Sequence, residues 1–217
     1  MRTAAQSFLR HPLSAVFANP ANVRVLRELS RHGGELSATM LVERTRLSKP
    51  SVLAALAHLS GLGYIESLGS HRQRLHRIDS KHPLASSISS LFLTEDHRFQ
   101  AIIEAIRKAA TEAGAAAAWL YGSVARAEDR PDSDVDVALV STRNAGAAKG
   151  KMRDALREVE GALRFSTSVV SVDTDDIRRL VRERDPWWVA MVKDAMPLVG
   201  PDPVSLAARP EPKKKAV

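Results

Sequence analysis

The stretch W-L-Y-G-S-V-A-R-A-E-D-R-P-D-S-D-V-D-V-A-L-V, residues 119–140, carries the strongest structural pattern in the chain. An apolar run ends at Gly122 and Ser123, a short charged segment follows, and Asp134 and Asp136 then alternate with valines. This order predicts a strand, a tight turn into a helix, and a second strand. Because side chains two residues apart on a strand share a face, we expect the two carboxylates to lie together.

These residue types suit a phosphate group and a metal ion. Gly122 permits a close backbone approach that a Cβ would block, and the N–H groups at the start of a helix point toward an anion. The Ser123 hydroxyl can donate to a phosphate oxygen. A carboxylate pair suits Mg²⁺, which binds carboxylates together with substrate phosphates. The stretch therefore predicts a site for metal-assisted nucleotidyl transfer.

The elements expected around this stretch alternate between strand and helix, which is typical of an α/β domain. The predicted strands are 115–121, 134–140, 167–172 and 196–199, and the predicted helices are 96–114, 123–127, 149–162, 175–183 and 187–195. Trp187 and Trp188 begin the last of these helices. We expect them to pack in the core or a lid rather than to stack on a base.

The segment Y-G-S-V-A-R-A-E-D-R-P-D-S-D-V-D-V-A-L-V resembles the signature of the polymerase-beta-like nucleotidyltransferase superfamily, in its minimal nucleotidyltransferase branch. Members of that family transfer a nucleoside monophosphate from a nucleoside triphosphate to a hydroxyl. The resemblance extends over about 97–200. By matched position it implies that Gly122, Ser123 and Arg126 bind the nucleotide, that Asp134 and Asp136 bind Mg²⁺, and that the catalytic residues are Asp134, Asp136 and Ser123.

One position departs from the family pattern. Active members usually have a third carboxylate on the next strand, where it serves as a metal ligand or general base. Matching that strand to this chain places Ser168 there. Asp173 falls on the opposite face by the period of two, and Asp175 and Asp176 are expected to cap or begin the following helix. Two alternatives stay open: a working transferase, and a domain that binds nucleotide and metal without turnover.

The composition is that of a globular protein. Of 217 residues, 44% are hydrophobic and 26% are charged, which argues against disorder and allows one large or two small domains. There is no cysteine, so disulfides and thiolate metal sites are excluded. No apolar run approaches the roughly 20 residues of a membrane span, and residues 1–12 do not resemble a signal peptide. The expected partners include no membrane, and the expected location is cytoplasmic.

The positive charge is concentrated in the first part of the chain. Residues 1–90 hold 12 of the 32 Lys and Arg but only 5 of the 25 Asp and Glu, which is the whole net charge of +7. A polyanion such as DNA would be attracted to that part. A basic surface that serves only solubility is the alternative that charge alone leaves open.

Residues 13–82 predict three short helices followed by a hairpin. Asn19, Ser37 and Ser48 are each expected to cap a helix, and apolar residues recur at helical spacing after each cap. The hairpin strands are predicted at 64–68 and 71–78. His71 and His76 in the second strand have no third ligand beside them, so histidines that face phosphate or solvent are favoured over a metal site.

This pattern resembles a winged helix-turn-helix domain of bacterial transcription regulators, above all in L-S-K-P-S-V-L-A-A-L-A-H-L-S-G-L-G-Y-I, residues 47–65. The resemblance implies a third helix in the major groove and a hairpin on the DNA backbone or minor groove. The residues it places on DNA are Ser48, Lys49, Ser51, His58, Arg72, Arg74 and Arg77. The third helix is rich in alanine and lacks arginine, so phosphate binding by the hairpin is expected to outweigh base reading. The alternative is a winged helix used for protein contacts or for a homodimer.

The sequence as a whole predicts an α/β (α+β) protein of two domains. The expected parts are a winged helix-turn-helix domain (13–82), a linker (83–96), a nucleotidyltransferase-like domain with a mixed sheet (97–202), and a disordered basic tail (203–217). The expected function is DNA binding combined with Mg²⁺-dependent transfer of a nucleotide to a hydroxyl of RNA or of a protein, such as a toxin in antitoxin-type members of the family. The alternatives are a transcription regulator that only binds nucleotide, and a non-enzymatic module for assembly.

Overall fold

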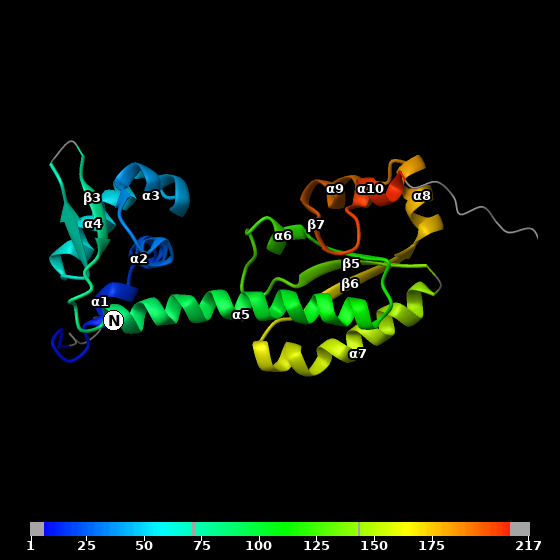
Figure 1. Ribbon diagram of the computed structural model, residues 1–217, viewed down its shortest axis with the longest axis horizontal. Coiled ribbons are helices and arrows are strands. Elements are labelled where there is room, and N and C mark those ends of the chain that lie inside the picture. The colour runs from blue at the N-terminus through cyan, green and yellow to red at the C-terminus, as the bar shows by residue number, and fades with distance from the viewer. Residues whose placement is uncertain (1–6, 71–72, 143, 209–217) are drawn as a thin grey trace, which may run out of the picture. The chain divides into compact units, whose positions relative to one another are not determined.

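A computed structural model describes residues 7–70, 73–142 and 144–208. The chain divides into two compact units between His97 and Arg98, and each contains helices and a sheet (Figure 1). The prediction of a two-domain protein with mixed helices and sheets is confirmed.

The first unit packs short helices against a small sheet. Its elements are α1 (Leu13–Phe17), α2 (Pro20–His32), β1 (Leu36–Ser37), α3 (Ala38–Thr45), α4 (Lys49–Gly61), β2 (Ile65–Leu68) and β3 (Leu75–Ile78). The sheet order is β1-β3-β2, with both pairs antiparallel. The three helices and the hairpin were expected, whereas α1 and β1 were not, because each is too short to show a period.

Side-chain caps fix where the helices of the first unit begin. Asn19 accepts a hydrogen bond from the backbone N–H two residues on, at 2.9 Å. Ser37 and Ser48 each accept one from the N–H three residues on, at 3.2 Å and 3.3 Å. Each such cap contributes about 1 kcal/mol to helix stability. All three caps lie where the sequence predicted them.

A single helix, α5 (Ala85–Glu112), runs through the division between the units. Residues 85–96 of the segment expected as a linker (83–96) therefore form the first turns of this helix. Ile88 and Phe92 are buried there in the core of the first unit. Tertiary burial of these two side chains outweighs the weak helix propensity of the serines around them. Glu95 accepts two hydrogen bonds from Arg27 of α2, at 2.6 Å and 3.0 Å.

The second unit is a four-stranded mixed sheet with helices on both faces. Its elements after α5 are β4 (Ala117–Tyr121), α6 (Gly122–Ala125), β5 (Val135–Ser141), α7 (Ala145–Leu163), β6 (Thr167–Asp173), α8 (Thr174–Arg182), α9 (Pro186–Asp194), β7 (Met196–Val199) and α10 (Pro203–Ala207). The strand order is β6-β5-β4-β7. β5 and β6 are parallel, and the other pairs are antiparallel.

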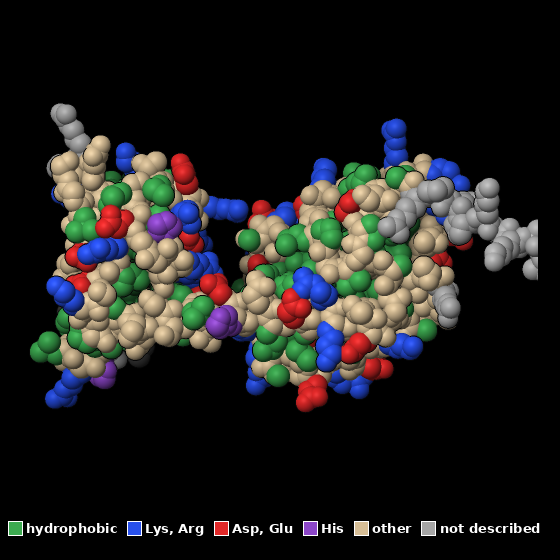
Figure 2. All heavy atoms as spheres, viewed as in Figure 1, with side chains coloured by type: hydrophobic (Ala, Val, Ile, Leu, Met, Phe, Trp, Pro, Cys, Tyr) green, Lys and Arg blue, Asp and Glu red, His purple; other side chains and the backbone are tan. Residues whose placement is uncertain are grey.

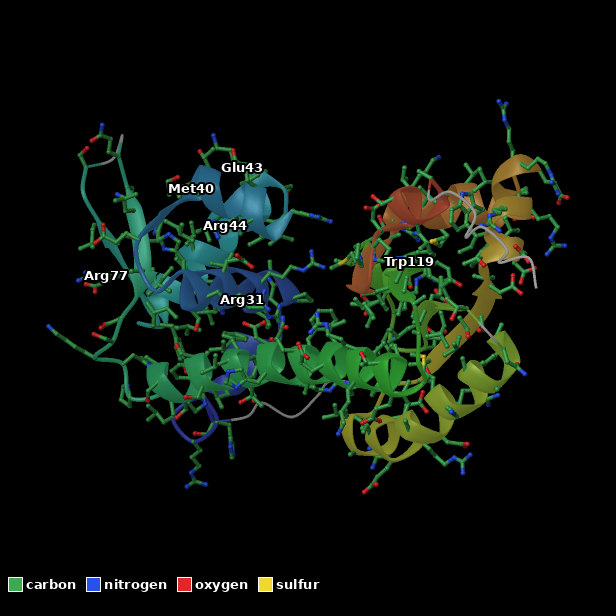
Figure 3. The ribbon with its side chains drawn as sticks, turned by 45° about the vertical axis from the view of Figure 1, so that its right-hand side comes forward. Arg31, Met40, Glu43, Arg44, Arg77 and Trp119 are labelled. Carbon is green, nitrogen blue, oxygen red and sulfur yellow. The ribbon has the colours of Figure 1, made fainter. Side chains whose placement is uncertain are left out.

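Alternate residues of β5 enter two separate cores. Leu139 packs on one face with Met152 of α7 and with the later turns of α5. Val140 packs on the other face with Trp119 and Trp188, whose rings meet edge to face at 6.1 Å. Trp119 lies inside the second unit (Figure 3), and its indole N–H donates to the carbonyl oxygen of Pro201 at 2.8 Å. The face that holds the tryptophans is also the face of Asp136, by parity along the strand.

A short helix follows the last strand of the second unit. Residues 203–207 of the segment expected as a disordered tail form α10, which buries Leu206. Lysines 213–215 lie outside the described residues. No helix in the described part of the chain is long and apolar enough to cross a membrane.

Candidate functional site

Gly122 meets Asp136 where β4 ends. The register pairs Tyr121 with Asp136 across the antiparallel β4–β5 ladder, so the next residue turns over the aspartate side chain. Gly122 has φ +76°, and a Cβ built on it would stand 3.2 Å from Cγ of Asp136 and closer still to its Oδ2. Both the backbone conformation and the close approach require glycine at this position. Ser123 follows directly on α6 and is half-buried.

Asp134 and Asp136 form the carboxylate pair that the sequence predicted. Asp134 is exposed just before β5, and Asp136 is half-buried within the strand. Burial raises the pKa of Asp136, and the negative charge of Asp134 raises it further. A hydrogen bond from Ser168 and the charge of Arg126 act in the opposite direction. The two carboxylates repel each other, and a cation between them would relieve that repulsion.

Ser168 occupies the neighbouring place on β6. The parallel register sets it beside Asp136. Asp173 lies at the far end of the same strand, opposite Ser141, where its side chain caps α8 together with Asp176. It is therefore not the third acid of the site. Within the described ranges, no group of three or more His, Asp or Glu side chains is placed to hold a metal ion.

Arg126 lies near the carboxylate pair but is bound to other partners. Its Nε donates to Glu128 at 2.8 Å, and its Nη1 forms an ion pair with Asp194 at the end of α9. These bonds raise the pKa of the guanidinium. The arginine that the sequence placed near phosphates therefore joins α6 to α9 in this structure.

Two features of the site were missed by sequence reasoning. The first is Ser166, whose hydroxyl donates to Asp134. Only the strand register, which is invisible in the sequence, brings it there. The second is an aromatic pair, in which the Trp187 indole N–H donates to the Tyr121 hydroxyl at 3.4 Å and the rings meet edge to face at 5.9 Å. Trp188 is buried in the core, in line with its expected packing role.

The predicted DNA-facing residues of α4 divide into different environments. Lys49 is exposed at the start of the helix. Ser48 is the cap of α4, and its hydroxyl also lies 2.8 Å from that of Ser51. Nε2 of His58 lies 3.4 Å from the carbonyl oxygen of Ala15 in α1. Of these four predicted residues, Lys49 is the one with a long cationic side chain in solvent.

The predicted DNA-facing arginines of the hairpin also lie in different environments. Arg74 is exposed. Arg77 donates to Glu66 at 2.7 Å and to Glu35 at 3.5 Å, so its charge is already compensated. Figure 3 shows Arg77 on the hairpin. Arg72 and His71 lie outside the described residues.

A groove of about 1170 Å³ separates α4 from the hairpin, and Lys49 and Arg74 both line it. His76 also lines this groove but is only 6% exposed, and its Nδ1 lies 3.0 Å from the Ser67 hydroxyl. Figure 2 shows cationic side chains at several places on the visible face of the first unit, with acidic side chains between them. The groove is thus lined by one exposed cation from α4, Lys49, and one from the hairpin, Arg74.

Comparison with known families assigns both units. A model of the MarR family matches residues 19–74, and a model of the polymerase beta nucleotidyltransferases matches residues 102–183. A solved ArsR-family transcriptional regulator is 23% identical over 45% of this chain and 96% of its own, with a TM-score of 0.30. None of the curated proteins compared with the chain matches it. The chain therefore joins a MarR-like winged helix-turn-helix domain to a polymerase-beta-like nucleotidyltransferase domain.

Proposed function

We propose that this protein binds DNA through its first unit and transfers a nucleoside monophosphate from a nucleoside triphosphate through its second. The acceptor is a hydroxyl of an RNA or of a protein, of the kind that a toxin partner would present. One observation carries the transferase part: Gly122 packs its backbone against Asp136 beside the exposed Asp134. DNA and nucleoside triphosphates meet in the cytoplasm, so the proposal places the protein there.

The residues at this site fit a divalent cation such as Mg²⁺. Asp134 and Asp136 supply two carboxylates on one edge of the sheet, and their mutual repulsion favours a cation between them. Mg²⁺ is usually bound by one or two carboxylates, with the rest of its ligands from water and substrate phosphates. When bound, the cation would neutralise charge on the phosphates and polarise the transferred group.

The chain's own residues bind and orient the nucleotide. Gly122 leaves room for a phosphate against the backbone, and the Ser123 hydroxyl donates to a phosphate oxygen. Arg126 reaches the phosphates if its guanidinium exchanges Asp194 or Glu128 for phosphate oxygens. Tyr121 is paired with Asp136 across the ladder, and its ring is held edge to face against Trp187.

A second candidate function rests on Ser168. A serine beside Asp136 cannot accept a proton from an attacking hydroxyl as a carboxylate can. The second candidate is therefore a transcription regulator whose nucleotidyltransferase domain binds nucleotide and metal without turnover.

Labelled ATP, CTP, GTP and UTP separate the two candidates. Each is incubated with the full chain, Mg²⁺ and cell extract, and label transfer and nucleotide retention are both measured. Transfer that disappears in Asp134→Ala supports the transferase. Retention without transfer supports the regulator. Failure to retain any of the four nucleotides contradicts both.

The DNA-binding part is tested by salt-dependent mobility shifts with two matched arginine variants. Arg74→Ala removes an exposed cation and should lower the slope of log affinity against log salt by about 1. Arg77→Ala removes an arginine already paired with two glutamates and should change the slope less. Equal slopes for Arg74→Ala and the wild type would contradict a contact between the hairpin and DNA.

A further inference from the structure

Each carboxylate of the proposed cation site has its own serine beside it. Ser166 donates its hydroxyl to Oδ1 of Asp134. Ser168 lies beside Asp136 in the parallel register, and its hydroxyl acts to lower the pKa of that carboxyl. Ser166 lies just before β6 and Ser168 within it, and in the same way Asp134 lies just before β5 and Asp136 within it. The two serine–aspartate pairs therefore follow one another along β5 and β6.

The strand register is what aligns these pairs. β5 and β6 are parallel and pair Asp136 directly with Ser168. One step earlier, the Val135 N–H donates to the carbonyl oxygen of Ser166 at 2.8 Å. Side chains two apart on a strand point the same way. Both serines therefore project toward the aspartates on the same face.

The residue between the two serines holds the start of β6 in place. Thr167 donates its backbone N–H and its hydroxyl to Oε1 of Glu160 in α7, at 2.9 Å and 2.6 Å. Two hydrogen bonds to one charged oxygen are each stronger than a neutral bond. They fix the strand on the face opposite to the serines. The hydroxyl of Ser168 consequently stands on a held strand, and that of Ser166 stands on the residue directly before it.

We propose that Ser166 and Ser168 are positioning residues that orient Asp134 and Asp136 to bind one divalent cation together with the nucleotide. A hydroxyl that donates to a carboxylate occupies one of its lone pairs and selects one side-chain orientation. The remaining oxygens then face the cation. Hydrogen bonds of this kind behind metal ligands change metal affinity by about 10–100-fold. Two carboxylates backed by neutral hydroxyls provide a charge suited to one cation, with phosphate oxygens as its other ligands.

The inference rests on the proposed nucleotide site, and a binding measurement tests it without any turnover. Mn²⁺ is titrated into the full chain in the presence of a non-hydrolysable ATP, CTP, GTP or UTP analogue, and bound Mn²⁺ is counted by electron paramagnetic resonance. The wild type should bind one equivalent. Ser166→Ala and Ser168→Ala should each weaken Mn²⁺ binding by about 10–100-fold, with the count unchanged.

Two further variants separate orientation from general damage. Ser168→Thr keeps the hydroxyl on a strand that favours β-branched residues, so it should retain the affinity. Ser171→Ala makes the same substitution on the same strand, where the hydroxyl donates to Ala145 at 2.7 Å away from the site. It should also leave Mn²⁺ binding unchanged.

The outcomes are distinguishable. Wild-type affinity in both Ser166→Ala and Ser168→Ala overturns the positioning role, and two equivalents of Mn²⁺ in the wild type overturn the single-cation site. Equal losses in Ser168→Thr and Ser168→Ala also overturn the role of the hydroxyl. A wild type that binds neither Mn²⁺ nor any of the analogues overturns the proposed nucleotide site itself.

Discussion

Gly122 and Asp136 are pressed together where β4 turns over β5, and no side chain fits between them. A Gly122→Ala variant adds a Cβ that would displace the Asp136 carboxylate and also strains a φ of +76°. We expect this variant to lose nucleotide binding. Its free energy of unfolding should be lower than that of the wild type by about 1–3 kcal/mol. Denaturant unfolding and nucleotide titration measure the two effects.

Gly150→Ala is the control for this substitution. Gly150 lies within α7, where an added Cβ meets nothing within 4 Å. The change should stabilise the protein by roughly 0.5–1 kcal/mol and leave nucleotide binding intact. Similar behaviour of the two variants would contradict the role assigned to Gly122.

A third acid can be added to the site at Ser168. Ser168→Asp places a carboxylate beside Asp136, where a general base for the attacking hydroxyl is missing. If the wild type transfers label slowly, the variant should transfer it about 10²-fold faster or more, the lower range for general base catalysis. Ser168→Asn, of the same shape without the charge, should show no gain. A gain in both variants would argue against base catalysis.

His76 should make the first unit sensitive to acid. Burial lowers the pKa of His76, and the charge of Arg74 lowers it further. The folded protein therefore binds a proton less readily than the unfolded chain, whose histidine titrates at about 6.5. Stability is full above this pH and falls as the pH drops through it toward the lower folded value. Thermal unfolding from pH 8 to pH 5 measures the loss.

The His76→Gln variant should lose less stability than the wild type as the pH falls from 8 to 5. His97→Gln, at an exposed position, should follow the wild type. If the His76 variant loses as much stability between pH 7 and pH 5 as the wild type does, His76 is not the source.

Tyr64 and Tyr121 should respond oppositely to loss of the hydroxyl. The Tyr64 hydroxyl is buried with no hydrogen-bond partner in the described part of the chain. Tyr64→Phe removes this unpaired group and should stabilise the protein by about 1 kcal/mol, since the ring contact with His82 at 3.9 Å remains. Tyr121→Phe removes the acceptor of the Trp187 bond and should destabilise by roughly 0.5–1.5 kcal/mol. Thermal unfolding of both variants gives the comparison, and a destabilised Tyr64→Phe would indicate a partner for that hydroxyl.

Local patterns predicted the elements well. The caps at Asn19, Ser37 and Ser48 and the alternation in β5 depend on near neighbours in the chain, so sequence reveals them. The Gly122 turn and the facing pair of Asp134 and Asp136 followed from the same local rules.

Contacts between distant segments could not be predicted in the same way. Ser166 reaches Asp134, and Asp194 reaches Arg126, because of strand register and helix packing. Neither pair has a signal in the local sequence. The helical start of α5 was missed because its support comes from the core around Ile88 and Phe92 rather than from the propensity of its serines.

The continuous α5 helix also determines where the chain can be cut. A break between His97 and Arg98 would sever a ladder of helical hydrogen bonds, and both fragments would begin or end on an unprotected turn. Proteases need locally unfolded backbone, so limited proteolysis should spare this boundary and attack exposed loops instead. A fragment meant to hold either unit alone should therefore carry the whole of residues 85–112, and the helix would be present in both fragments.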